Sequence, residues 1–306
     1  MKKRIKLKIA DTIISLESDY TLEALTREEM RTQSPQRFKN FTYNGNAKPH
    51  IFIEVKVKKS LPVVKGLRNV FISYHPQDNR ANWQLLKNGN MFYFRSLIKG
   101  KLQCMKINKR FNRVSAYLLP KKEKGFVWNY IDIIYDFLQV LLINYFALHR
   151  QGLFVHSIGV KDRDESGLLF AGKSGAGKST TARIWHAHSG AMVLNDDRII
   201  LRKSNGFFSI YGSPWHGEFS DYLISRIESA ALKKLFFIHH APRNTVRPIG
   251  EREAFHNLYP TLFAPFWDKG LLKNAVAFSS DVIKRTACFS LGFVNNKRVI
   301  DFVRNI

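Results

Sequence analysis

The stretch "LLFAGKSGAGKSTTARIW", residues 168–185, constrains the fold of this chain more than any other. An apolar run leads into the pattern GxxxxGK[ST] over Gly172–Ser179, and helix-forming residues follow it. Glycines let a backbone curl its N–H groups around a compact anion, and the helix that follows adds the positive end of its dipole. The stretch therefore predicts a strand, a phosphate-binding loop and a helix in succession, which is the P-loop arrangement.

The loop also predicts which groups would contact a phosphate chain. The backbone N–H groups from Lys173 to Lys178 can cradle the β-phosphate, and the Lys178 ammonium can reach the β and γ oxygens. The Ser179 hydroxyl can hold Mg²⁺, so the sequence predicts ATP and Mg²⁺ as cofactors. The residues expected to contact the nucleotide are Gly172, Lys173, Ser174, Gly175, Ala176, Gly177, Lys178, Ser179 and Thr180. The alternative is a glycine-rich turn that binds no nucleotide.

Two adjacent carboxylates, Asp196 and Asp197, follow the apolar strand "AMVL", 17 and 18 residues beyond Ser179. That separation accommodates the helix after the loop and a returning strand. One carboxylate can hold Mg²⁺, directly or through water, while the other accepts a proton from an attacking group. The alternative is a turn with solvated acids, or a helix N-cap. Two like charges at the expected site of a triphosphate favour the functional interpretation.

Other residues near this predicted edge of the sheet carry weaker signals. His156 lies in the strand "LFVHSIGV", where it is either a core histidine or a group that handles a proton or contacts phosphate. His216 and Glu218 lie in the Gly/Pro loop "GSPWHGE", and Arg243 and Arg247 lie in "APRNTVRP". Loops of this kind often carry function, but the sequence assigns no role to these four residues.

The chain shows two regions with different patterns. Residues 1–119 contain short segments with alternating apolar and polar residues, such as "HIFIEVKVK" and "LQCMKIN", which predict strands. The charged segment "PKKEKG", residues 120–125, has Pro and Gly at its ends and predicts a boundary. We therefore expect a smaller, basic, β-rich domain over residues 1–125, followed by an α/β P-loop domain over residues 126–306.

Strands and helices alternate in the second region. We expect a long helix over about 127–150 that ends with Gly152 as a left-handed cap, and further helices over 251–264 and 271–286 after a loop rich in Pro and Arg. The long helix carries one polar stripe, which favours burial over a membrane span. The residues of the stripe are Asn129, Asp132, Asp136 and Gln139.

The formal net charge of +25 is unevenly distributed, because residues 1–125 hold 27 Lys and Arg against 9 Asp and Glu. Such a region attracts anions, for instance nucleic acid or an acidic peptide or protein; the alternative is a solvated, lysine-rich surface. Cys104 and Cys288 are far apart and lack the spacing of metal ligands, so we expect both in the core. No signal peptide or membrane span is indicated, and we expect a cytoplasmic protein.

Three segments together resemble a known family. "VHSIGV", "GLLFAGKSGAGKSTTARIW" and "VLNDDRIIL", within about residues 152–204, are similar to the core of the C-terminal domain of HPr kinase/phosphorylase. That family in turn resembles ATP-dependent phosphoenolpyruvate carboxykinase in fold. The glycine-rich "EIRGLG" type of segment is missing, and "PWHGE" stands in its place. The chain looks more similar to HPr-kinase-like proteins found beside peptide-modifying genes, including kinases that phosphorylate the C-terminal serine of lasso-peptide precursors.

The resemblance implies roles for particular residues. Asp196 would act as the base toward a serine hydroxyl, Asp197 would lie near Mg²⁺, and His156 would assist at the phosphate. The glycines of the loop, Lys178, Ser179 and Thr180 would bind nucleotide and metal.

These observations favour an ATP-dependent kinase, with Asp196, Lys178 and His156 as catalytic residues, that phosphorylates a Ser or Thr hydroxyl of a peptide or protein. The alternative is a non-catalytic ATP-binding regulatory protein whose basic domain binds an anionic partner. A nucleic-acid kinase is a third interpretation, but no aromatic-basic signature supports nucleic acid as a partner. The sequence leaves an oligomer open.

Overall fold

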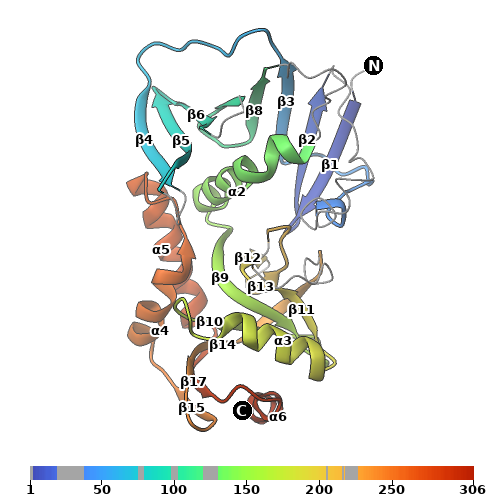
Figure 1. The fold of residues 1–306 in the computed structure, drawn as a ribbon, viewed down its shortest axis with the longest axis vertical. Helices are drawn as coiled ribbons and strands as arrows, with labels where there is room; N and C mark the ends of the chain where they lie inside the picture. The colour runs from blue at the N-terminus through green and yellow to red at the C-terminus, as the bar shows by residue number, and fades with distance from the viewer. Residues whose placement is uncertain are drawn as a thin grey trace. The chain divides into compact units, whose positions relative to one another are not determined.

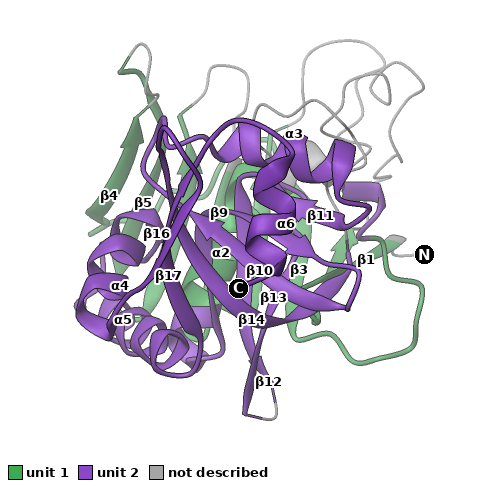
Figure 2. Cartoon of the chain, turned by 90° about the horizontal axis from the view of Figure 1, so that it is seen from below, with its two compact units in different colours: residues 1–35, 42–145 green, residues 36–41, 146–306 purple. Residues whose placement is uncertain are grey.

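The computed structural model describes residues 3–18, 38–74, 79–97, 103–119, 130–204, 206–215, 217 and 227–306. The protein is a mixed α/β structure with two large sheets. The chain divides into two compact units, residues 1–35 with 42–145 and residues 36–41 with 146–306 (Figure 2). The domain boundary expected at residues 120–125 lies outside the described residues and stays a prediction.

Unit 1 contains an eight-stranded sheet in the order β1-β2-β3-β8-β7-β6-β5-β4 (Figure 1). All neighbours pair antiparallel except β2 with β3 and β3 with β8. The strands are β1 (Lys3–Ile9), β2 (Thr12–Ser18), β3 (Ile51–Val57), β4 (Arg68–Tyr74), β5 (Ala81–Asn88), β6 (Met91–Ser96), β7 (Gln103–Ile107) and β8 (Arg113–Leu118).

Sequence alternation explains most of this sheet, but one strand was missed. Asn88 and Gly89 in "LLKNGNMFYF" predict a tight hairpin turn between two strands. This prediction is confirmed, since Asn88 of β5 lies opposite Met91 of β6. The strand β2 was not predicted; it returns antiparallel to β1 after a turn at Ala10 and Asp11. Both turn residues have left-handed φ angles, 44° and 57°. Ala is a poor residue for that conformation, so the turn carried no recognisable signal.

The helix α2 (Tyr130–His149) lies against the unit 1 sheet (Figure 1). The ring of its residue Phe137 packs against that of Phe94 in β6, with centroids 5.5 Å apart. From Ile134 onward most of the apolar side chains of α2 are buried, whereas Asp136 and Gln139 are half-buried, in agreement with the expected polar stripe. Asn129 and the side chain of Asp132 lie outside what the structure describes. The predicted cap at Gly152 was wrong: Arg150 takes the left-handed conformation (φ 50°), and Gly152 already begins the next strand. Among the described helices, none is long and apolar enough to cross a membrane.

Unit 2 contains a nine-stranded sheet in which β10, β9, β12, β13 and β14 form a closed ring. The strand β17 extends the ring from β14, and β15 pairs with β17. The strands are β9 (Gly152–Lys161), β10 (Ser166–Ala171), β11 (Met192–Asn195), β12 (Arg198–Ser204), β13 (Phe207–Tyr211), β14 (Ser229–His240), β15 (Thr245–Pro248), β16 (Leu262–Phe263) and β17 (Ala287–Phe293). The helices are α3 (Lys178–His188), α4 (Glu251–Leu258), the 3-10 turn η3 (Tyr259–Thr261), α5 (Lys269–Lys284) and α6 (Arg298–Arg304).

Three predictions for this unit were wrong in detail. The helix expected over 251–264 ends at Leu258, after which η3 and the short strand β16 follow. The helix expected from residue 271 begins at Lys269, because Asp268 caps it by accepting hydrogen bonds from the N–H groups of Gly270 and Leu271. The loop rich in Pro and Arg contains β15, which pairs with β17.

A hydrophobic core lies beneath α3 and α6. Phe170 of β10 stacks on Phe236 of β14, with centroids 5.2 Å apart, and lies 5.5 Å from the fully buried Trp185 of α3. Arg304 of α6 donates to both carboxylate oxygens of Asp162 and to the carbonyl of Ser189 at 2.6–3.1 Å. Asp162 is buried, so the guanidinium compensates its charge. Both cysteines are buried, as expected.

Replacement of Arg304 should therefore destabilise unit 2. In Arg304→Ala, the carboxylate of Asp162 stays buried without its guanidinium, and we expect the free energy of unfolding to fall by about 1–3 kcal/mol. The matched control is Arg298→Ala at an exposed position of the same helix. Urea denaturation measures both variants. Equal losses of stability in Arg304→Ala and Arg298→Ala would contradict a stabilising role for the ion pair between Arg304 and Asp162.

Candidate functional site

A cavity of about 490 Å³ lies at the carboxyl ends of the parallel strands β10 and β14. Its lining brings together segments far apart in sequence: the glycine-rich loop, the start of α3, the turn between β11 and β12, and the end of β14. The lining residues are His156, Ser174, Gly175, Gly177, Lys178, Ser179, Thr180, Asp196, Asp197, Gly217 and His240. Of the predicted site residues, Gly172, Lys173 and Ala176 do not line this cavity; they line a neighbouring one.

The glycines of the loop are required by its shape. Gly175 and Gly177 have φ angles of 79° and 93°, which residues with a side chain rarely adopt. A Cβ atom at Gly177 would lie 2.6 Å from the Phe293 ring and 3.0 Å from His240. Gly177 is also the N-cap of α3 and makes no side-chain cap hydrogen bond. The first N–H groups of this helix are therefore left for another acceptor.

Lys178, the first residue of α3, folds back over the loop. Its ammonium donates to the carbonyl oxygens of Gly172 (2.9 Å) and Lys173 (3.0 Å), and the side chain is largely buried. Burial lowers the pKa of Lys178 below its ordinary value, and the carboxylate of Asp197 opposes part of this effect. The ammonium of Lys178 is therefore fixed at the loop by two carbonyl groups, in the lining of the cavity.

Asp197 lies in a cluster of positive and proton-donating groups. The Nδ1 atom of His156 is 2.6 Å from its Oδ1, and the Nε atom of Arg198 is 3.6 Å from its Oδ2. Burial alone would raise the pKa of Asp197, but the hydrogen bond with His156 and the charges of Arg198 and Lys178 outweigh it, so the pKa is lowered. Asp197 is thus stabilised as an anion.

Asp196 lies in a different environment although it is the next residue. The residue is 3% exposed, and its Oδ1 accepts a hydrogen bond from the N–H of Gly217 at 3.1 Å. A Cβ atom at Gly217 would lie 2.9 Å from the other carboxylate oxygen, so this close approach needs a glycine. The two aspartates therefore line the same cavity with different hydrogen-bond partners.

Asn195 holds the turn that carries both aspartates, and sequence reasoning assigned it no role. Its amide nitrogen donates to the carbonyls of Ser213 (2.9 Å) and Trp215 (2.8 Å). Its amide oxygen accepts from the N–H groups of Asp197 (2.9 Å) and Arg198 (2.8 Å). The side chain is fully buried, so all four bonds are protected from water. The sequence does show an asparagine directly before the Asp pair. Its role could not be deduced, because the carbonyls to which it donates lie 18 and 20 residues further along the chain.

Replacing Asn195 by aspartate should loosen this turn. Asn195→Asp keeps the shape but loses both donors and points a carboxylate oxygen at two carbonyls, so the free energy of unfolding should fall by about 2 kcal/mol or more. Asn69→Asp, at an exposed position of β4, is the control and should change it by less than about 0.5 kcal/mol. Urea denaturation measures the free energy of unfolding of both variants. A loss in Asn195→Asp no larger than that in Asn69→Asp would contradict the role of Asn195 in holding the turn.

The lowered pKa of Asp197 predicts a pH-dependent contribution to stability. A carboxylate whose pKa is lower in the folded than in the unfolded state stabilises the fold at pH values above its unfolded-state pKa, which is 3.8 for aspartate. This contribution is lost as the pH falls through the folded-state pKa. Asp197→Asn should therefore be less stable than wild type at neutral pH, by about 1–2 kcal/mol. The difference in the free energy of unfolding should shrink below pH 3.8. A difference independent of pH would contradict the electrostatic origin.

His240 is a further site residue that sequence reasoning missed. It ends β14, which pairs in parallel with β10 so that Ala171 lies opposite Phe237. Residues after Ala171 and after Phe237 therefore emerge at the same edge of the sheet, where the loop lies. The segment "FFIHH" does show two histidines at the end of an apolar strand. The sequence did not reveal that this strand lies beside the one that leads into the glycine-rich loop, so His240 could not be assigned to the site.

The remaining candidates are not brought to this cavity. Arg247 makes a bidentate ion pair with Glu253 at the surface (2.6 and 3.0 Å), and Arg243 is exposed and lines no part of the cavity. His216 and Glu218 lie outside the described residues. Trp215, which directly precedes His216, is buried against Phe38 and Phe154.

The residues fit a magnesium ion that is shared with a nucleotide. No group of three or more His, Cys, Asp or Glu residues suited to a metal occurs within the described parts of the chain. Mg²⁺, however, is commonly held by one or two protein oxygens together with phosphates and water. The Ser179 hydroxyl and the Asp197 carboxylate both line the cavity and offer two such oxygens.

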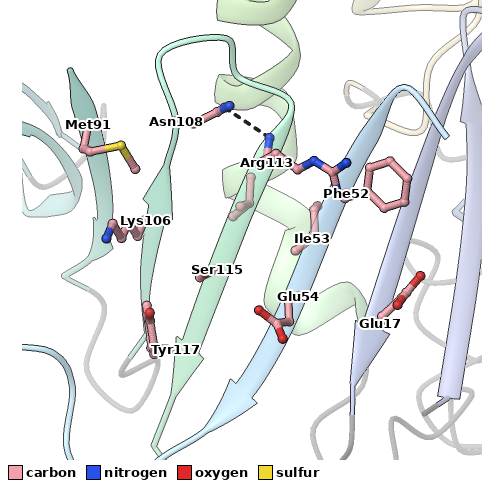
Figure 3. Close-up of a pocket in the computed structure, with 11 residues that line it drawn as sticks. Glu17, Phe52, Ile53, Glu54, Met91, Lys106, Asn108, Arg113, Ser115 and Tyr117 are labelled. Carbon is pink, nitrogen blue, oxygen red and sulfur yellow. Dashed lines mark hydrogen bonds between the residues drawn. The ribbon is translucent and has the colours of Figure 1, made fainter.

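A second cavity, of about 380 Å³, lies on the sheet of unit 1 (Figure 3). The guanidinium of Arg113 covers the ring of Phe52 at 4.1 Å, and the backbone N–H of Arg113 donates to Oδ1 of Asn108. The carboxylates of this cavity, Glu17 and Glu54, form ion pairs with Arg4 and Lys56. Since acids and bases mix here, the positive charge of residues 1–125 is not concentrated in this cavity.

Comparisons with known proteins add little to this geometry. No family description and no curated protein matches the chain. A solved structure, the Hpr(Ser) kinase/phosphatase from Coxiella burnetii, is 13% identical; the match covers 42% of this chain and 90% of that one, with a TM-score of 0.23. So low a similarity carries no argument about activity, and function has to be argued from the residues of the cavity.

Proposed function

We propose that this protein is an ATP-dependent kinase that transfers the γ-phosphoryl group to a Ser or Thr hydroxyl of a peptide or protein. The observation that carries the proposal is that the glycine-rich loop, Lys178 and the Asp196–Asp197 pair line one cavity. A loop of N–H groups and a lysine binds phosphates, and paired carboxylates serve metal binding and proton transfer. The resemblance of residues 152–204 to the HPr kinase/phosphorylase family agrees with this class.

The loop and the start of α3 bind the phosphates in this proposal. The N–H groups near Gly175 and Gly177 surround the β-phosphate, and Lys178 turns from the loop carbonyls toward the β and γ oxygens. Ser179 and Asp197 would hold Mg²⁺, which supplies positive charge to the phosphate oxygens when bound. The lowered pKa of Asp197 suits a ligand that must stay anionic.

Asp196 accepts the proton of the attacking hydroxyl. The hydroxyl oxygen forms a bond to the γ-phosphorus, the bond from this phosphorus to the β,γ-bridging oxygen breaks, and ADP leaves with the electron pair. Asp197, occupied by His156 and Arg198, is the less suitable proton acceptor. His156 holds Asp197 in place and faces the same cavity, from which it can contact a phosphate oxygen.

The charge of the chain favours an acidic substrate. Residues 1–125 carry most of the excess of Lys and Arg, which attracts a negatively charged peptide or protein. The resemblance to kinases of lasso-peptide precursors makes peptides with a C-terminal serine the first substrates to test. A cytoplasmic location, where ATP and Mg²⁺ are available, is part of the same proposal.

The proposal predicts label transfer that depends on Asp196. With γ-labelled ATP, Mg²⁺ and acidic serine peptides, wild type should label the peptide, and Asp196→Asn should reduce the rate about 100-fold or more. Asp301→Asn, at an exposed position of α6, is the control and should keep the activity. Full transfer by Asp196→Asn would remove the base assignment. ATP binding without transfer to any acceptor would favour the alternative, a regulatory ATP-binding protein.

A further inference from the structure

A neighbouring cavity of about 440 Å³ adjoins the cavity at the Asp pair along the glycine-rich loop. Ser174, Gly175 and His240 line both, so the two spaces share a wall. The neighbouring cavity is lined by Gly172, Lys173, Ser174, Gly175, Ala176, Phe237, Ile238, His239, His240, Asn257 and Ser290. A ligand whose phosphates lie on the loop can therefore extend into it.

The two cavities differ in chemistry. The first holds Lys178, Asp196 and Asp197, which suit phosphate, metal and proton transfer. Among the described residues, no carboxylate lines the second cavity. There the neutral polar groups of Asn257 and Ser290 lie beside Lys173, two histidines and apolar residues. Neutral donors and acceptors on an apolar wall are typical of sites for uncharged heteroaromatic ligands.

His240 lies between the two spaces. Its ring is 5.4 Å from the Phe293 ring, at 32°, and the side chain is exposed. The lack of a side chain at Gly177 lets both rings approach the loop, because a Cβ atom there would lie 2.6 Å from Phe293. An aromatic ring at this point offers a stacking surface, and the amide of Asn257 offers one donor group and one acceptor to the edge of a base.

We propose that the neighbouring cavity binds the nucleoside of the triphosphate whose phosphates lie on the glycine-rich loop, with His240 stacking on the base and Asn257 contacting its edge. The inference rests on the proposed function, because it needs a nucleoside triphosphate in the first cavity. It adds a base-recognition site and assigns it to the ends of β14 and α4.

Binding of ATP and of inorganic tripolyphosphate, each with Mg²⁺, separates the two sites. Titration calorimetry on the full chain should show that Asn257→Ala weakens ATP about three- to tenfold and leaves tripolyphosphate unchanged, the size expected for the loss of one hydrogen bond. The control is His256→Ala, next to it on α4 and outside both cavities, which should change neither ligand. Thermal unfolding checks that the variants are folded.

The outcomes distinguish the inference from the proposed function. Wild-type binding of ATP and tripolyphosphate with equal affinity, or equal effects of Asn257→Ala on both ligands, would overturn the base site while the phosphate site stands. Failure of wild type to bind either ligand would overturn the proposed function and the inference with it. His240→Phe should keep ATP within about threefold and His240→Ala should weaken it further, since only the first retains an aromatic ring. Equal losses would overturn the stacking role.

Discussion

The site depends on the pairing of β9 along both of its edges. Val160 of this strand lies opposite Leu168 of β10 and also opposite Val193 of β11, so β9 separates the strand that leads into the loop from the strand that leads into the Asp turn. The N–H of Ser157 donates to the carbonyl of Asp197 at 3.0 Å, and Ser157 also pairs with Ala171 at the end of β10. One strand thus fixes the distance between the loop and the carboxylates.

The two adjacent aspartates show how local packing separates the properties of identical side chains. Asp197 contacts His156 and Arg198, and these groups favour its charged form. Asp196 is turned to the backbone of Gly217. The side chain of Asn195 holds the turn that carries both aspartates. It accepts from the N–H groups of Asp197 and Arg198 and donates to the carbonyls of Ser213 and Trp215. Distinct roles in catalysis need such differences, because free aspartates have the same pKa.

Features with a local cause could be predicted from the sequence, and features set by distant partners could not. The strand, glycine-rich loop and helix over 166–188 follow from residues next to one another, as does the hairpin at Asn88. The strands β2 and β16 were missed because an unusual turn and tertiary pairing with β9 decide them. His240 and Asn195 were missed because their importance depends on which strands are neighbours.

The closed ring of β10, β9, β12, β13 and β14 leaves none of these strands at an edge of the sheet. Unpaired edges are the places where a sheet can recruit a strand from another chain, and they are also where strands slip in register. The ring strands beside the cavity of Lys178 and Asp196 are therefore protected from strand recruitment and from register slips. Among the described strands of unit 2, unpaired edges remain at β15, which ends the strand order, and at the short strands β11 and β16, which each pair with β9 alone.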